Sequence, residues 1–116
     1  MNRTDLERLR DARRYVLAAL EAAGDDGFEA LWASRVRGHS LILDVILIGE
    51  AFGKVSPAVR VVAPEITLTE ITWTRNRLTH VYWLHERQFV EDLIERDLPP
   101  LLASVTKLVS LLESGT

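Results

Sequence analysis

The chain has 116 residues, enough for one domain over residues 1–116 whose core needs no disulfide or metal. It contains no cysteine, which excludes a disulfide framework, a thiolate nucleophile and a zinc–thiolate site. With 14 Lys and Arg against 17 Asp and Glu, the net charge is −3. That balance argues against broad, non-specific nucleic-acid binding, which needs a basic face, but it allows a local basic groove.

The N-terminal segment predicts a helix. Residues 1–7 are charged and lack the apolar core of a signal peptide. Thr4 and Glu7 have the spacing of a capping box, and apolar residues then recur at helical spacing as far as Ala23. We therefore expect a helix over residues 4–23, and the turn Gly24-Asp25-Asp26-Gly27 should end it and supply the next N-cap.

The following segment predicts one long helix from Phe28 to about Phe52. Its second half, from Leu41, is apolar almost all round, and only Asp44 and Glu50 interrupt it. Such a helix must be covered on several sides, so we expect a central position or a homodimer interface. A buried strand is the competing interpretation, but the length and the lack of turn signals favour a helix. The run is too short to span a bilayer, and we expect a soluble, cytoplasmic protein with no membrane partner.

The second half of the chain also predicts helices. Residues 53–64 form a connector, and Thr67 with Glu70 is a second capping box that opens a helix carrying residues 75–82. A last helical region begins near Glu86. It must kink or restart at Pro99-Pro100, because proline cannot donate to the helix ladder, and Asp97 could cap the restart. The fold class is all-α, a helical bundle.

The residues with the most chemistry lie between positions 75 and 82. They are two arginines, an asparagine, a histidine and a tyrosine: Arg75, Asn76, Arg77, His80 and Tyr82. Arg75 and His80 are five positions apart, about 140° round an ideal helix. They can converge only if the helix ends or distorts near His80, or if a second subunit brings its own copy alongside. Dimerisation is therefore part of the functional hypothesis.

These groups could support cleavage of RNA without a metal. His80 could deprotonate the ribose 2′-hydroxyl or protonate the leaving oxygen. Arg75 could hold the phosphate and stabilise the charge that develops on it. Asn76 could orient His80 or donate to a phosphate oxygen, and Arg77 is a further candidate for RNA binding.

A structural interpretation competes with this one. An Arg, Asn and His on one helix often cap a neighbouring helix or pair with carboxylates. Glu50, a carboxylate inside an apolar helix that is expected to be covered, must be paired to be tolerated, and Arg75 is its candidate partner. His39 and His85 lack companions at metal-ligand spacing, so no metal and no cofactor are expected.

The segment from Arg75 to Tyr82 resembles the Arg-x₄-His-x-Tyr signature of HepT-like toxins, a branch of the HEPN superfamily. Residues 48–51 resemble that family's central-helix motif, and residues 63–66 and 97–102 also fit. The resemblance implies a homodimeric, antiparallel bundle of about four to five helices. Val81 stands where the family often has glycine, and Leu68 where Trp is common, but neither departure removes a catalytic group.

The resemblance also implies a function. The chain would be the toxin of a toxin–antitoxin pair, an endoribonuclease in which Arg75 and His80 serve RNA cleavage, with Glu50 in a supporting role. Its partner would be a minimal nucleotidyltransferase antitoxin that neutralises it by AMP transfer to Tyr82. Phosphates attached there would occupy the phosphate site and repel RNA.

Two other interpretations remain. The chain could be a catalytically silent helical dimer that binds a nucleotidyltransferase as scaffold or modification target. It could also be a structural dimerisation module. The pair Arg75 and His80 separates these from the enzyme, because a binding scaffold has no need for both.

Overall fold

The computed structural model describes residues 3–57, 59 and 87–114, and all regular structure within these residues is helical. The all-α prediction is confirmed. The helices are α1 (Arg3–Ala23), α2 (Phe28–Ala33), α3 (Arg35–Gly53), α6 (Arg87–Asp92) and α7 (Leu98–Ser114), and a π-helical turn, η2 (Leu93–Asp97), joins the last two. The helix and capping box predicted from Thr67 lie outside the described residues, as does the side chain of Thr4.

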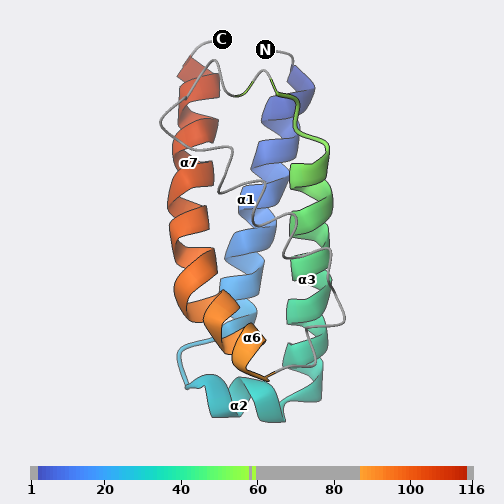
Figure 1. Cartoon of the computed structure of the whole chain (residues 1–116), viewed down its shortest axis with the longest axis vertical. Coiled ribbons are helices and arrows are strands. Elements are labelled where there is room, and N and C mark those ends of the chain that lie inside the picture. Colours follow the sequence, from blue (N-terminus) through green and yellow to red (C-terminus); the bar gives the residue numbers. More distant parts are fainter. Residues whose placement is uncertain (1–2, 58, 60–86, 115–116) are drawn as a thin grey trace.

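The three long helices α1, α3 and α7 lie side by side, and the short α2 crosses the end of the bundle where α1 ends and α3 begins (Figure 1). Helix α1 packs against both α3 and α7. Four of its side chains have no exposed surface: Leu9, Ala12, Val16 and Ala19. Their spacing of three and four residues forms one helical stripe, which is the centre of the core.

Helix α3 has one buried face and one open face. Leu41, Val45, Ile48 and Phe52 are buried at helical spacing. On the opposite side Val36 is 80% exposed and Leu43 is 57% exposed. We expected this helix to lie either at the centre of the bundle or at a homodimer interface. In the described bundle the central helix is α1, and α3 has exposed apolar side chains on its outer face. None of the helices in the described ranges combines the length and apolar character needed to cross a lipid bilayer.

The prediction of one continuous helix from Phe28 to Phe52 is wrong, because the chain breaks at Ser34. Ser34 has extended backbone angles (φ −92°, ψ 109°), and its hydroxyl accepts a hydrogen bond of 3.2 Å from the Arg37 N–H. That is the geometry of an N-cap, which stabilises the first turn of α3. No glycine or proline marks the break, so the sequence offers only a weak signal for it.

The turn between α1 and α2 ends α1 and supplies the next N-cap, as predicted. Gly24 and Gly27 have φ values of 72° and 98°, which residues with a side chain rarely adopt. Gly27 is the N-cap of α2, and no side-chain hydrogen bond caps that helix. The turn therefore supplies the N-cap of α2 as predicted, through Gly27, and Asp26 binds an arginine of α3.

The last helical region adapts to Pro99-Pro100 before it reaches them. In η2 the Leu98 N–H donates to the Leu93 carbonyl, five residues back, and Leu98 itself is helical. Pro99 and Pro100 have no backbone N–H to donate to an α-helical hydrogen bond. The wider π-helical turn η2 lies immediately before them. The region therefore remains helical through Pro99-Pro100, and Asp97 is the last residue of the π-helical turn, directly before α7.

Candidate functional site

Five of the six predicted site residues, Arg75, Asn76, Arg77, His80 and Tyr82, lie outside the described residues. Glu50 is the one that the structure places. It lies near the end of α3, and its side chain is exposed. An exposed carboxylate keeps its hydration and needs no counter-ion, so Glu50 is not the buried group in need of a partner that its apolar neighbours suggest. Its supporting role in RNA cleavage remains a prediction.

Glu50 borders a hollow of about 290 Å³ between α1 and α3. The described residues that line it are Glu7, Arg8, Asp11, Tyr15, Leu47, Glu50, Ala51 and Lys54. Three of them are carboxylates and two are cations, and the Arg8 guanidinium is bound to the Lys54 carbonyl oxygen. This side of the hollow therefore has no excess of positive charge with which to hold RNA phosphates.

The backbone around Glu50 is held firmly against the start of α1. Asp5, only 1% exposed, accepts a 2.8 Å hydrogen bond from the Ser56 N–H, just after α3. Together with the contact between Arg8 and Lys54, this fixes the end of α3 on α1. Within the described residues, no group of three or more His, Asp or Glu side chains is arranged to hold a metal ion.

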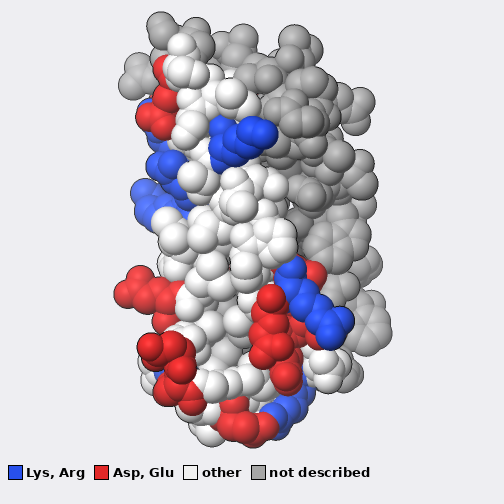
Figure 2. Space-filling view, turned by 90° about the vertical axis from the view of Figure 1, so that its left-hand side faces the viewer, with Lys and Arg blue, Asp and Glu red and all other residues white. Residues whose placement is uncertain are grey.

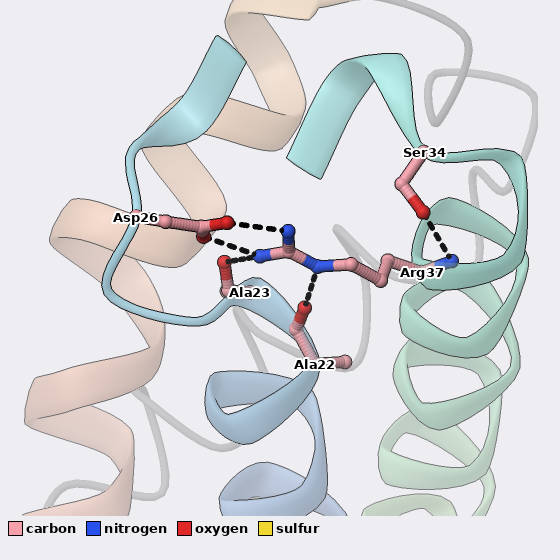
Figure 3. A network of polar contacts seen from close by, with 5 residues as sticks. All are labelled: Ala22, Ala23, Asp26, Ser34 and Arg37. Carbon is pink, nitrogen blue, oxygen red and sulfur yellow. Dashed lines mark hydrogen bonds and ion pairs between the residues drawn. The ribbon is translucent and has the colours of Figure 1, made fainter. Parts of the chain in front are cut away.

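At the opposite end of α3, Arg37 joins three segments of the chain (Figure 3). Its Nε donates to the Ala22 carbonyl at 3.1 Å and its Nη2 donates to the Ala23 carbonyl at 2.7 Å. Both terminal nitrogens also donate to the Asp26 carboxylate, at 2.9 and 2.8 Å. The guanidinium thereby satisfies the last carbonyls of α1, where the helix dipole favours a positive charge.

Because these bonds occupy Arg37, it does not contribute to a groove for RNA. The sequence places Arg37 among several arginines in the middle of the chain, and nothing in its spacing marks it as structural. Its partner Asp26 lies eleven positions earlier, in the turn after α1. The hydrogen bonds from Arg37 lower the pKa of Asp26, and the Asp26 carboxylate raises the pKa of Arg37.

An Arg37→Ala variant is expected to unfold at a lower temperature than the wild type at pH 7, because it leaves the α1 carbonyls and Asp26 without their donor. Since the folded state lowers the pKa of Asp26, this part of the stability is present above about pH 4 and is lost as the pH falls further. Thermal unfolding followed by circular dichroism at pH 7 and pH 3 tests both points. The difference in unfolding temperature between wild type and variant should be smaller at pH 3 than at pH 7. It should not vanish, because the hydrogen bonds from Arg37 to the Ala22 and Ala23 carbonyls remain in the wild type.

Arg35→Ala is the matched control, because Arg35 lies in the same turn of α3, is exposed, and makes no hydrogen bond or ion pair within the described residues. Equal losses in the two variants would contradict the structural role of Arg37.

Charges of both signs are spread over the described surface, and Figure 2 shows acidic and basic side chains interleaved on the face that carries α7. Several arginines are paired with carboxylates: Arg10 with Glu113 at 3.0 Å, Arg14 with Asp11 at 3.1 Å, and Arg87 with Glu29. The described part of this face has no continuous basic surface. Any RNA contact made by the described residues of this face must therefore be local, as the net charge of the chain predicts.

Comparison with known proteins gives one match. A family model described as "Ribonuclease HepT-like" matches residues 5–108. The match covers most of the 116 residues, including α1 from its third residue, all of α2, α3 and α6, and much of α7. Neither the curated proteins nor the solved structures gave a match.

Proposed function

The chain belongs to the HepT-like ribonuclease family, and on that premise we propose that it is a toxin of a toxin–antitoxin pair that cleaves RNA as an endoribonuclease. The family match over residues 5–108 is the observation that carries the proposal. The segment from Arg75 to Tyr82, which lies within the matched residues, also supports it, because it joins a phosphate-binding group to a proton-transfer group in the motif expected of such an enzyme.

The reaction divides between two side chains. The ribose 2′-oxygen attacks the adjacent phosphorus, and the bond from phosphorus to the 5′-oxygen breaks. His80 transfers a proton, either from the attacking hydroxyl or to the leaving oxygen. Arg75 binds the phosphate and stabilises the negative charge that grows on its oxygens. The products are an end with a 2′,3′-cyclic phosphate and an end with a 5′-hydroxyl.

The proposed enzyme is a homodimer. The outer face of α3 supports this, because Val36 and Leu43 are seven positions apart on one side of the helix and are 80% and 57% exposed. Covering them with the same face of a second copy would remove apolar surface from water. A dimer would also provide one of the two ways in which Arg75 and His80 can meet, across a groove between two subunits.

The experiment that tests the function is RNA cleavage by purified protein in the presence of EDTA. The proposal expects cleavage without metal and products that end in 2′,3′-cyclic phosphate. An intact RNA after incubation with wild-type protein would support the alternative, a catalytically silent dimer that serves a nucleotidyltransferase as scaffold or modification target.

Tyr82 is proposed as the point of control by the partner. A minimal nucleotidyltransferase antitoxin would transfer AMP to the Tyr82 hydroxyl, releasing pyrophosphate from ATP, and the added phosphate would repel RNA. Co-expression of the two proteins should raise the intact mass of the wild-type chain by one or more AMP units. Tyr82→Phe keeps the ring but removes the acceptor oxygen, so its mass should not change. An unmodified wild-type chain would contradict this control mechanism.

A further inference from the structure

A cavity of about 320 Å³ lies at the end of the bundle where α2 and α3 meet α6. Leu31, Leu41 and Val90 form an apolar floor, each no more than 3% exposed. Trp32, Arg35 and His39 also line it. Its volume is at the lower end of the range for small-molecule sites, and an apolar wall with a few polar groups is typical of such sites.

Trp32 forms the aromatic wall of this cavity, and a ring outside the cavity supports it. The Trp32 ring stacks on Phe28, with centroids 5.7 Å apart and planes 24° apart. Phe28 does not line the cavity, and the Arg87 guanidinium lies 5.3 Å from the centre of its ring. Trp32 nevertheless remains 39% exposed. The indole is therefore a supported surface with area left for another flat group.

No acidic side chain is among the described residues that line the cavity. Arg35 and His39 are the titratable side chains among its described lining residues, and both are exposed. They are four positions apart on α3, so they project from the same side of the helix. Arg35 makes no hydrogen bond or ion pair within the described residues, and the nearby Glu29 of α2 is paired with Arg87. In a chain whose net charge is −3, this opening favours an anionic ligand.

We propose that this cavity binds a single nucleotide, with the base against Trp32 and the phosphate at Arg35. A nucleotide combines a flat apolar ring with a phosphate that guanidinium binds well, which are the two features that the cavity complements. The biological meaning rests on the proposed RNA cleavage, since the site would hold one nucleotide of an RNA outside the motif at residues 75–82. Binding itself does not depend on cleavage.

Calorimetric titration with AMP, and with adenosine for comparison, tests the site in the full-length chain. Wild type should bind AMP more tightly than adenosine, and added salt should reduce that difference. Trp32→Leu should weaken both ligands by roughly tenfold or more, because the stacking surface is lost. Arg35→Gln should weaken AMP and leave adenosine unchanged. Arg13→Gln is the control: it removes an arginine of α1 that does not line the cavity, and it should bind AMP like wild type.

Several results would overturn the proposal. One is equal AMP affinity in wild type, Trp32→Leu and Arg35→Gln. Another is full competition by inorganic phosphate at the concentration at which AMP binds. A third is binding of an acidic peptide with one aromatic residue in place of AMP, which would make the occupant a protein. Arg35 is exposed, so its variant remains informative even if Trp32→Leu fails to fold.

RNA cleavage and AMP binding are both measured on the wild-type chain to separate the two proposals, and the titration is repeated with His80→Ala, which should bind AMP like wild type. AMP binding by a wild-type chain that does not cleave RNA would leave the cavity proposal intact while the proposed function fails. RNA cleavage by a wild-type chain that does not bind AMP would leave the proposed function intact while the cavity proposal fails.

Discussion

His80→Ala is expected to lose RNA cleavage by roughly 100- to 10,000-fold, the usual contribution of a general acid or base. The reason is that alanine can neither take the 2′-hydroxyl proton nor supply one to the leaving oxygen. The measurement is the initial rate of cleavage of a labelled RNA in EDTA. Circular dichroism and light scattering must show that the variant keeps the helical content and the oligomeric state of the wild type.

His85→Ala is the matched control for this variant. It also removes one imidazole, but from a position outside the Arg-x₄-His motif. We expect it to retain most of the activity. Equal rates for wild type and His80→Ala would refute the enzyme proposal. A wild type that cleaves RNA as a monomer at micromolar concentration would refute the two-subunit groove and leave a distorted helix near His80 as the way to bring Arg75 and His80 together.

Phe52→Ala is expected to lower the free energy of unfolding by about 3–5 kcal/mol, the usual cost of removing a buried aromatic ring. Phe52 is 1% exposed in the last turn of α3 and belongs to the core that α3 shares with α1 and α7. Its removal leaves a cavity that close-packed neighbours fill only in part. Urea unfolding followed by circular dichroism measures the loss, at matched protein concentrations because a dimer would make stability depend on concentration.

Leu17→Ala provides the comparison, since Leu17 is 49% exposed on α1 and its truncation opens no cavity. We expect a change within about 0.5 kcal/mol. Similar losses for Phe52→Ala and Leu17→Ala would mean that the described core does not carry the stability of the chain.

Local patterns predicted much of the fold. The apolar spacing that begins at Leu6 and the glycines at 24 and 27 predicted α1 and its end within one residue. Apolar residues also recur at helical spacing from Leu101 to Leu112, and most of them form the buried face of α7. These features depend on residues close together in the chain, and their periodicity can be read without knowing what they pack against.

The errors share a different cause. The break at Ser34 has a serine N-cap but no glycine or proline, so the sequence of residues 28–52 predicts one helix. The structural role of Arg37 depends on hydrogen bonds to two carbonyls at the end of α1 and to a carboxylate in the turn that follows. These acceptors surround the guanidinium only when α3 packs against α1. Glu50 was expected to be buried because its neighbours are apolar, and it is exposed because it lies on the outer side of α3.

For the candidate site, sequence and structure contribute different parts. The sequence alone identifies the motif residues Arg75, His80 and Tyr82, since a motif is a local pattern. It also identifies the family, because the family match extends over residues 5–108. The single-domain boundary, the motif roles and the dimer remain predictions. The tertiary structure decided which arginines are free. Arg37 and Arg87 are held by carboxylates, while Arg35 stands at an apolar cavity beside Trp32. Charge and composition alone cannot make that distinction, because an arginine acquires its partners only when helices distant in sequence pack together.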